Sequence, residues 1–339
     1  MEVWAPMDQR MPLAAVADYA RRAESLGFDG LNVPDAVHDG LLLAQAALAA
    51  THSLRVATSV LVAFPRSPMN VAHAAWDLQA FSGGRFELGL GSQVRGNIEG
   101  RYSVSWSPPV PRMREYVGSL RAIFAAWQEG TPLAFEGNHY AFTRMQPFFN
   151  PGPLPGGAIP IHLGGIGPAM TALAGEVADG LMCHPTNSSP RYLREVVQPR
   201  IVKGAARTGR KISSLQLMAA DLVATGPHGE AVRAAREGIR ELLGFLFSTP
   251  SYWPSLELYG YEDLGTRLRD MTRSGRWAEM AAQIPETLLD ALVPTGVYSE
   301  MPEVLLERFA GLASRITFPI PEDPAEDQAV KKVLAALRR

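Results

Sequence analysis

Two apolar segments of the chain end in glycines, and each ending is a place where a flat, phosphorylated ligand could bind. The first runs from Ser82 to Gln93 and carries Gly89 and Gly91 in an apolar strand. Because glycine has no Cβ atom, such a strand end lets a planar ligand approach the main chain closely. The second runs from Ile159 to Pro168 and leads into a predicted helix through Gly164, Gly165, Ile166 and Gly167. Amide groups exposed at such a helix start suit a phosphate, although an ordinary tight turn has the same composition.

Polar side chains follow two of the predicted strands, where they could move protons or bind the polar edge of a ligand. Asp35 and His38 follow the second strand, and a histidine there could give or accept a proton near neutral pH. The alternative is structural: Asp35 caps a turn after Pro34, and His38 is a half-exposed surface residue. Asn97 and Arg101 follow the fourth strand and could contact a ligand, although an isolated arginine is also typical of a solvated surface.

Three other kinds of chemistry lack the residues that they need. The histidines show no metal-ligand spacing such as His-Glu-x-x-His, so we expect no catalytic metal. A serine hydrolase would need Gly-x-Ser-x-Gly, but Gly91 stands where the serine should be. A dinucleotide fingerprint would need a third glycine where this chain has Val94, and an acidic residue at a strand end further on. A Rossmann fold therefore remains only as an alternative.

The composition describes a large globular protein that acts on a small molecule. The chain has 339 residues, 47% of them hydrophobic, and a formal net charge of -2. Since it has no basic runs, we expect neither nucleic acid nor a membrane surface as a partner, but a small-molecule substrate. The single cysteine, Cys183, excludes an internal disulfide, and the N-terminus lacks the pattern of a signal peptide. The longest apolar run, Leu41 to Ala50, is too short to span a bilayer, so a cytoplasmic protein is expected.

Strand and helix patterns alternate along the whole chain. The predicted strands are Val3 to Pro6, Phe28 to Pro34, Arg55 to Ala63, Phe86 to Leu90, Ile159 to Leu163, Gly180 to His184, Leu215 to Ala224 and Arg315 to Ile320. The predicted helices begin near Pro12 and Pro68 or cover Leu41 to Ala50, Met113 to Trp127, Ala169 to Val177, Tyr192 to Thr208 and Gly229 to Leu242. Eight such units predict an α/β fold, a closed (β/α)8 TIM barrel with its helices outside.

A weak internal repeat supports the barrel. Asp29-Gly30-Leu31 and Asp179-Gly180-Leu181 each lie between a helix end and a strand start, four units apart. In a closed barrel these two strands would face each other. We expect one domain over residues 1–339.

Three segments exceed the needs of a barrel, at about 94–111, 129–158 and 245–301. The second carries a hairpin signal over residues 135–140, and the other two extend loops at the catalytic rim. The last insertion is rich in aromatic residues, which would suit a lid over an apolar substrate or a helical layer packed on the barrel wall. These aromatic residues are Phe245, Phe247, Tyr252, Trp253, Tyr259 and Tyr261.

With these residues in hand, nearly the whole chain resembles the luciferase-like oxidoreductases, in particular their coenzyme F420-dependent branch. The resemblance depends on the order and spacing of four motifs, none of which is decisive alone. They are Ala23 to Gly30, Ala57 to Val60, Ser82 to Gly91 and Ala174 to Gly180.

The resemblance implies a TIM barrel, a homodimer, and a set of contacts with the deazaflavin cofactor F420. At Ser59-Val60 it implies a non-proline cis peptide in a bulge that supports the back of the deazaflavin ring. It places the cofactor phosphate on amides of the segment Gly164 to Gly167, Ile166 included. It places ring contacts on the segment after the fourth strand, namely Gly91, Ser92, Gln93 and Asn97.

The chain departs from this family at two polar positions. Several F420-dependent relatives carry Asp-His at the end of the second strand, where this chain has Asp35-Ala36 and then His38. Some relatives also carry a glutamate after the fourth strand, where this chain has Gln93-Val94. The proton donor is therefore assigned by default to Asp35 or His38.

The resulting prediction is hydride transfer between F420 and a small, apolar organic substrate. The nearest alternative is an FMN-dependent monooxygenase on the same barrel. A barrel that binds a flavin or a phosphate ligand without turnover is the second alternative.

Overall fold

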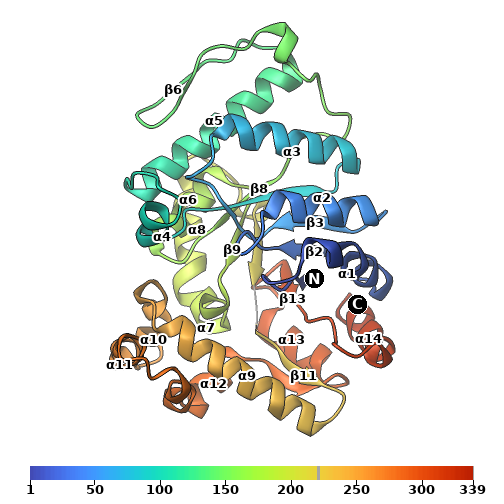
Figure 1. Cartoon of the computed structure of the whole chain (residues 1–339), viewed down its shortest axis with the longest axis vertical. Coiled ribbons are helices and arrows are strands. Elements are labelled where there is room, and N and C mark those ends of the chain that lie inside the picture. Colours follow the sequence, from blue (N-terminus) through green and yellow to red (C-terminus); the bar gives the residue numbers. More distant parts are fainter. Residues whose placement is uncertain (220–221, 339) are drawn as a thin grey trace.

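The computed structural model describes residues 1–219 and 222–338, and within them eight parallel strands close into a barrel (Figure 1). The last strand pairs with the first, and β3 pairs with β5, so the ring has no free edge. The barrel strands, in order around the ring, are β1 (Glu2–Pro6), β2 (Gly30–Val33), β3 (Arg55–Thr58), β5 (Phe86–Gly91), β8 (Ile161–Gly164), β9 (Gly180–Cys183), β10 (Gln216–Ala219) and β13 (Arg315–Thr317). The predicted TIM barrel is confirmed.

Eight helices cover the outside of the barrel; seven of them lie between consecutive barrel strands, and the eighth follows the last strand. They are α1 (Leu13–Leu26), α2 (Gly40–Ala50), α3 (Pro68–Ser82), α5 (Pro109–Glu129), α6 (Pro168–Val177), α8 (Gln198–Ala206), α13 (Met301–Phe309) and α14 (Asp327–Leu337). In α1 the buried residues Val16, Ala20 and Ala23 recur at helical spacing and face the strands. The helix ends at Gly27, whose φ of 94° is readily available only to glycine.

The third predicted strand is interrupted. It forms β3 and then β4 (Leu61–Val62), both of which pair with β5, and between them the Ser59-Val60 peptide is cis. The cis peptide and the bulge that the resemblance implied at this position are therefore confirmed.

The repeated Asp-Gly-Leu motif has the same function at both of its positions. Asp29 accepts the amide proton of Val3 on the neighbouring strand at 2.8 Å, and Asp179 accepts that of Ile161 at 2.8 Å. Because β2 and β9 are the second and sixth strands of the ring, they lie opposite each other, as the repeat predicted. Each aspartate fixes the start of the preceding strand.

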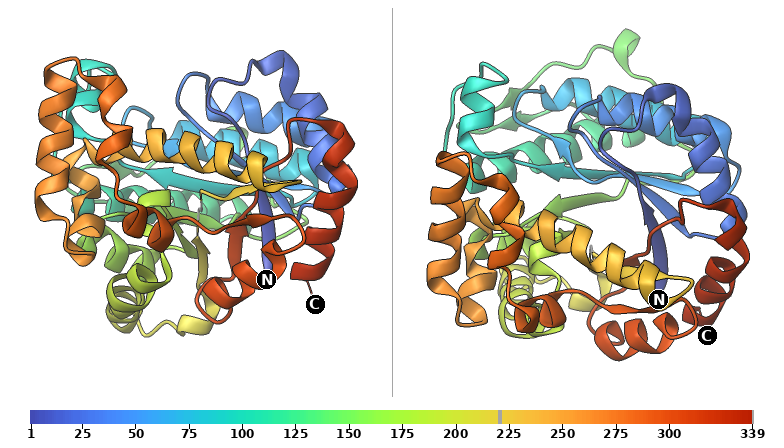
Figure 2. Two further views of the ribbon diagram at one scale, coloured as in Figure 1. Left: turned by 90° about the horizontal axis from the view of Figure 1, so that it is seen from below. Right: turned by 60° about the horizontal axis from the view of Figure 1, so that its bottom comes forward.

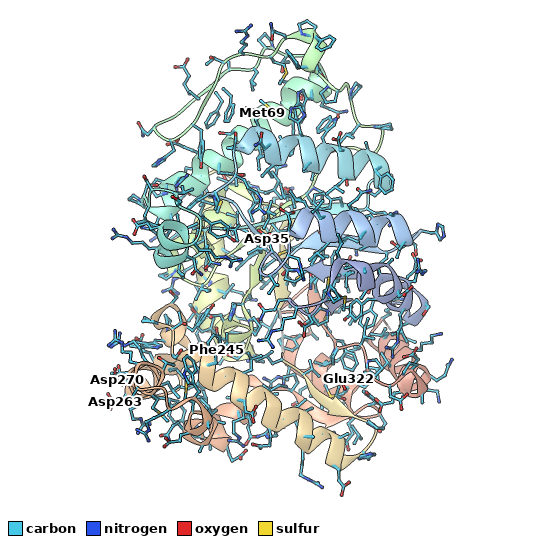
Figure 3. The ribbon with its side chains drawn as sticks, viewed as in Figure 1. Asp35, Met69, Phe245, Asp263, Asp270 and Glu322 are labelled. Carbon is cyan, nitrogen blue, oxygen red and sulfur yellow. The ribbon has the colours of Figure 1, made fainter. Side chains whose placement is uncertain are left out.

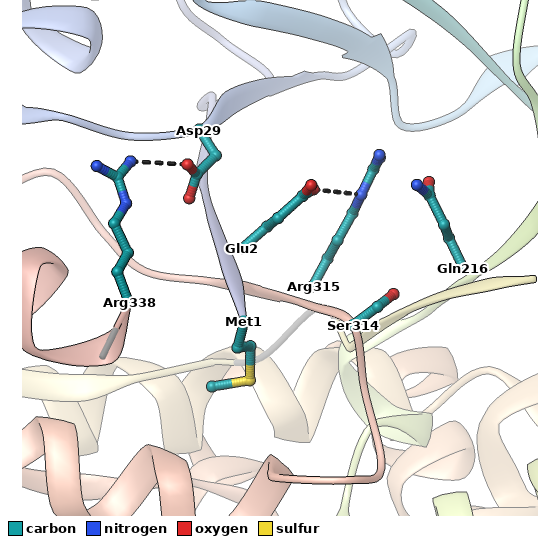
Figure 4. A pocket seen from close by; sticks show the side chains of 7 residues that line it. All are labelled: Met1, Glu2, Asp29, Gln216, Ser314, Arg315 and Arg338. Carbon is teal, nitrogen blue, oxygen red and sulfur yellow. Dashed lines mark hydrogen bonds and ion pairs between the residues drawn. The ribbon is translucent and has the colours of Figure 1, made fainter. Parts of the chain in front are cut away.

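The lower half of the barrel interior is filled by charged side chains beneath one aromatic ring. Glu87 pairs with Arg315 and with His162 inside the barrel, with His162 Nε2 2.8 Å from its carboxylate. Trp4 is fully buried above them, with the Arg315 guanidinium 4.6 Å from its ring centre. Figure 4 shows the pocket at this N-terminal mouth, where Arg315 pairs with Glu2. This end of the barrel is closed by ion pairs and by Trp4.

Two of the added segments lie at the C-terminal rim, and the third packs along the outside of α5, where Glu115 accepts the amide protons of Asn138 and His139. α4 (Arg95–Gly100) follows β5, and α10 (Trp253–Leu258) and α11 (Glu262–Arg273) follow β10, and Figure 2 shows the two groups at the same end of the molecule. The predicted hairpin forms as β6 (Phe135–Glu136) paired with β7 (Ala141–Phe142), between α5 and β8.

The segment after β10 forms a layer with its own small core. The helix that we expected over Gly229 to Leu242 is α9 (Gly229–Phe247), and it packs on β11 (Ala224–Gly226) and β12 (Thr295–Val297) rather than on the barrel strands. The second core includes Leu243 and Phe247, so the insertion begins before residue 245, and α13 completes the seventh barrel unit. Part of the predicted strand Leu215 to Ala224, residues 220–221, lies outside the described residues.

The remaining short elements are η1 (Pro147–Phe149), η2 (Pro185–Asn187), α7 (Pro190–Tyr192), η3 (Leu193–Val197), η4 (Ile212–Ser214), η5 (Pro250–Tyr252), η6 (Trp277–Glu279), η7 (Ala281–Gln283), α12 (Glu286–Leu292) and η8 (Pro324–Glu326). Of these, α7 and η3 run directly into α8, α12 adds to the second core, and the others lie in connecting segments.

Candidate functional site

The bulge between β3 and β4 lies between two glycines of the neighbouring strands. A Cβ atom on Gly91 would lie 2.5 Å from Val60 Cγ2, and one on Gly164 would lie 3.1 Å from Val60 Cγ1. Only glycine at these two positions leaves room for the Val60 side chain. The Ser59 amide donates to Val33 O at 2.7 Å and ties the bulge to β2. Val60 is half-buried, so part of its side chain remains available at the rim.

This arrangement corrects one expectation from the sequence. We expected the glycines to leave bare main chain on which a planar ligand could lie. A Cβ on Gly89 would instead lie 2.0 Å from Thr58 O and 2.8 Å from Met182 Sδ, and Gly91 and Gly164 receive Val60. The missing side chains make room for the bulge and for Met182, so a ligand at this rim would meet Val60 rather than the strand backbone.

The glycine turn after β8 leads into α6 and leaves amides free at the start of that helix. Gly167 is the N-cap of α6 and carries no capping side chain. The N–H groups of Ala169 and Met170, in the first turn, have no acceptor among the described residues. A Cβ on Gly167 would have no neighbour within 4 Å, which shows that the space in front of the helix is open. Free amides and the positive end of the helix dipole make this turn suitable for a phosphate.

The inner residues of the same turn are held by the next strand. The Gly165 amide donates to Met182 O, and a Cβ on Gly165 would press on Leu181. The carbonyl of Ile166 accepts a hydrogen bond from the Tyr192 hydroxyl at 3.3 Å. The turn is therefore rigidly attached to β9 and to the loop that follows it.

Asp35 lies at the end of β2, near the centre of the molecule in Figure 3, and its carboxylate is fully used by its neighbours. It accepts hydrogen bonds from Val62 N and Arg66 Nη1, each at 2.8 Å, and from Gly40 N at 3.0 Å. Its side chain is only 4% exposed. The structure thus gives Asp35 the capping role, because it joins β4, α2 and Arg66, and it leaves little room for proton transfer.

The other predicted polar residues lie around the rim. His38 is half-buried in the loop after β2 and has no hydrogen-bond partner among the described residues. Gln93 has a positive φ of 57°, and its side chain accepts the Val94 amide proton. Ser92 and Asn97 are half-buried, and the described structure shows no side-chain hydrogen bond for either.

Arg101 does not point toward a ligand site. Its guanidinium donates to Ala36 O at 2.5 Å and thereby joins the loop after β5 to the loop after β2. The fold thus brings the predicted polar residues to one rim of the barrel. Asp35 and Arg101, however, bond to neighbouring loops and strands of this rim rather than facing a ligand site.

The sequence analysis missed His184, which follows β9. Its Nδ1 lies 2.9 Å from Thr186 Oγ1 and 3.3 Å from the Thr186 amide, and its ring stacks on Tyr252. Burial lowers the pKa of His184 to about 4, so this imidazole is neutral at physiological pH. A usable signal was present: His184 ends a strand just before Pro185, much as Asp35 follows Pro34 after β2.

The aromatic residues of the insertion divide into two groups. Phe247 is completely buried in the second core, and Trp253 donates to its carbonyl oxygen. Tyr252 and Tyr259 contact the β9 loop, where the Tyr259 hydroxyl donates to Ser189 Oγ at 2.9 Å. Phe245, marked in Figure 3, is 53% exposed. The insertion is thus in part a helical layer, in which some of the aromatic rings form a core, and in part a candidate cover of the site, because other rings contact the rim.

Residues 1–219 and 222–338 contain neither a cluster of metal ligands nor a membrane-spanning helix. No group of three or more His, Cys, Asp or Glu side chains in this part of the chain could hold a metal ion. No helix there is long and apolar enough to cross a bilayer.

Comparison with known proteins gives one family and several named relatives. A family model described as luciferase-like monooxygenase matches residues 2–315. An uncharacterized protein of Mycobacterium tuberculosis is 41% identical over 304 residues, covering 90% of this chain and 89% of the relative. A putative coenzyme F420-dependent oxidoreductase of the same organism is 30% identical and covers 83% of each chain.

The solved structures with this fold include one that is described with coenzyme F420 and one that is described with FMN. A coenzyme F420-dependent tetrahydromethanopterin reductase from Methanopyrus kandleri has a TM-score of 0.81 at 18% identity, covering 99% of this chain and 98% of that one. A monooxygenase from Pseudomonas putida in complex with FMN has a TM-score of 0.69 at 16% identity, covering 99% and 98%. At these identities the two structures show the fold alone. The family and its F420-dependent relatives support an oxidoreductase.

Proposed function

Because the chain belongs to the luciferase-like monooxygenase family, we propose that it is an F420-dependent oxidoreductase that transfers a hydride between deazaflavin and a small, apolar organic substrate. A relative that carries a functional name, a putative coenzyme F420-dependent oxidoreductase, supports this choice of cofactor. The proposal goes beyond the family because it names the cofactor and the reaction.

One observation carries the proposal: the Val60 bulge and the open start of α6 lie at the tips of two strands that are separated only by β5. β4 pairs with β5, and β5 pairs with β8, whose glycine turn leads into α6. An apolar side chain at one tip and free amides two strands away would suit a ligand with a flat ring and an anionic group.

The residues present fit such a cofactor. Val60 would support the ring from behind, and the amides of Ala169 and Met170 would hold a phosphate. Ser92, which follows β5, and Asn97, in α4, are half-buried, and their side chains have no hydrogen bond within the described part of the chain, so both could meet the ring edge. When bound, a reduced deazaflavin supplies a hydride to an electrophilic carbon, and an oxidised one accepts a hydride from an alcohol carbon.

The chain's own contribution is geometry. Asp35 and Arg66 fix the bulge, and the insertion places Tyr252 over the end of β9. A rigid rim of this kind keeps the reacting atoms close together, which accounts for much of the catalytic effect in such enzymes. The aromatic groups that meet the rim favour an apolar substrate.

The proposal is tested by adding F420 and, separately, FMN to the purified protein and measuring binding by fluorescence. We expect saturable binding of F420, bleaching of the bound oxidised cofactor when an oxidisable substrate is supplied, and return of its absorbance when the reduced cofactor meets a reducible substrate. Preferential binding of FMN with oxygen-dependent turnover would instead support the monooxygenase. Binding of F420 without turnover on any of a broad panel of alcohols, ketones and enones would support a non-catalytic barrel.

A further inference from the structure

His184 lies on the inner face of the barrel, two residues beyond Met182 toward the C-terminal rim. Gly180, Met182 and His184 alternate along one strand direction and therefore share a face. Met182 on this face packs in the interior with Val60 beside it. His184 keeps an extended backbone, with φ of -74° and ψ of 151°, so its imidazole continues this inner row toward the rim.

One ring nitrogen of His184 is already engaged with its own loop. The Thr186 amide donates to Nδ1 at 3.3 Å, and the Thr186 hydroxyl lies 2.9 Å from the same nitrogen. When the Asn187 side-chain amide is turned so that its otherwise unpartnered NH2 donates to the Thr186 hydroxyl oxygen, the hydroxyl proton is free to donate to Nδ1 as well. Because a main-chain N–H can only donate, Nδ1 acts as the acceptor and the ring proton belongs on Nε2. Nε2 has no partner among the described residues.

The ring is held from one side by the insertion. Tyr252 stacks on it with ring centres 4.3 Å apart and planes inclined by 14°. The segment that carries Tyr252 is fixed in turn, because the Tyr259 hydroxyl donates to Ser189 Oγ in the β9 loop. The same loop reaches the proposed phosphate site through the bond from Tyr192 to Ile166 O. Thus His184 is oriented by two elements that also frame the cofactor site.

We propose that His184 donates its Nε2–H hydrogen bond to the oxygen of a neutral substrate, a ketone or a secondary alcohol, and so places the reacting carbon against the cofactor. This inference rests on the proposed function and adds the substrate class to it. An uncharged imidazole offers one directional hydrogen-bond donor and carries no net charge. It therefore selects substrates that have an oxygen acceptor in the right place, and it does not attract anions in particular. His184 then acts on the oxygen in the way that a neutral electrophilic histidine does, without giving up its proton. The proton that the alkoxide takes up on reduction of a ketone, or that an alcohol loses on oxidation, is exchanged with water at the open rim.

The proposal fixes a tautomer, which can be observed without turnover. Protein labelled with ¹⁵N-histidine gives two-bond ¹H–¹⁵N spectra, and the signal absent from His184→Phe identifies His184. We expect the Nε2–H tautomer with no titration between about pH 5 and pH 8. An Nδ1–H tautomer, or protonation within that range, would overturn the proposal.

Substrate binding is tested in the same spectra with cyclohexanone, cyclohexanol and cyclohexane carboxylate as probes, each with F420, with FMN and without cofactor. We expect the Nε2 signal to move with the ketone and the alcohol and not with the carboxylate. His184→Gln keeps a donor near the Nε2 position, whereas His184→Phe keeps only the stack on Tyr252. Ketone binding should fall about tenfold or more in His184→Phe and recover largely in His184→Gln, with unchanged cofactor affinity in both.

The outcomes separate the two proposals. If F420 binds but no ketone or alcohol moves the His184 signal, this inference fails and the proposed function stands. If the ketone moves the signal only with FMN, the proposed cofactor is wrong and the substrate contact is kept. Equal ketone affinity in wild type and in a folded His184→Phe variant would contradict the inference under any cofactor.

Discussion

The carboxylate of Asp35 and the guanidinium of Arg66 form an ion pair at 2.8 Å beside β4, the strand that follows the Val60 bulge. The same carboxylate accepts the Val62 amide proton, so one aspartate fixes both the strand after the bulge and the arginine beside it. This relationship assigns to Asp35 a positioning role in place of the acid or base that the sequence suggested.

The first prediction concerns Asp35→Asn. The carboxylate has two acceptor oxygens, and each accepts a backbone amide proton and an Arg66 hydrogen bond. Asparagine keeps only one of these oxygens and turns an NH2 group toward the other pair of donors, so the free energy of unfolding should fall by about 2–3 kcal/mol. F420 affinity should fall with it, because the bulge loses its support. Asp39→Asn is the matched control: Asp39 also contacts Arg66, but its side chain is 41% exposed, so the loss should stay below about 1 kcal/mol. If Asp35→Asn kept full stability and cofactor affinity and lost only turnover, Asp35 would be a catalytic residue after all.

The second prediction tests whether Gly91 exists to admit Val60. Gly91→Ala should cost about 1–3 kcal/mol of stability and weaken cofactor binding, since its Cβ would lie 2.5 Å from Val60 Cγ2. Val60→Ala in the same chain should restore much of the stability, whereas cofactor affinity should remain low. Gly96→Ala, where a Cβ meets nothing within 4 Å, serves as the control. Additive losses in the double variant, measured by chemical denaturation, would contradict the steric account.

The third prediction uses the N-cap position of α6. Gly167→Asp places a carboxylate where it can accept the free first-turn amides, so the helix should be stabilised by up to about 1 kcal/mol. The same carboxylate would occupy and repel a phosphate, and cofactor affinity should fall about tenfold or more. Gly167→Ala fills little space and should change neither property greatly. Unimpaired cofactor binding by Gly167→Asp would place the phosphate elsewhere.

The fourth prediction concerns acid stability and Glu87. Burial opposes ionisation of Glu87, but the hydrogen bonds from His162 and Arg315 outweigh burial and lower its pKa to about 2. A carboxylate whose pKa is lower in the folded state contributes stability above its unfolded pKa, and this contribution is lost as the pH falls toward the folded value. Stability should therefore decline between about pH 4.5 and pH 2, by on the order of 3 kcal/mol from this group.

Glu87→Gln checks that assignment. The variant should be less stable at neutral pH, because Arg315 and His162 lose their partner inside the barrel, and it should show a shallower decline in acid. Parallel denaturant titrations of both proteins across the acid range measure the difference. Identical slopes would show that other carboxylates cause the acid loss.

Much of the barrel could be predicted because its strands and helices are local patterns. The run from Phe86 and the helix around Val16 show their periods in a few residues, and the repeated Asp29 and Asp179 even placed two strands opposite each other. The break at Ser59-Val60 could not be predicted from periodicity, because β-branched residues continue on both sides. It was predicted only from the resemblance.

The sequence predicted where the site lies better than it predicted what each residue does there. A sequence shows that Gly91 lacks a Cβ, but not that Val60 from another strand fills the space. Likewise Asp35 looks free in the sequence, and only the fold brings Arg66 to it. His184 was missed because its partner Tyr252 lies far along the chain, in the insertion.

The central claim, that this rim binds F420 between the Val60 bulge and the start of α6, is tested most directly by a crystal structure with the cofactor. We expect the deazaflavin ring against Val60, with a phosphate oxygen within hydrogen-bond distance of the Ala169 or Met170 amide and the open ring face toward His184. A ring bound away from Val60, or a phosphate held elsewhere than at α6, would contradict the account.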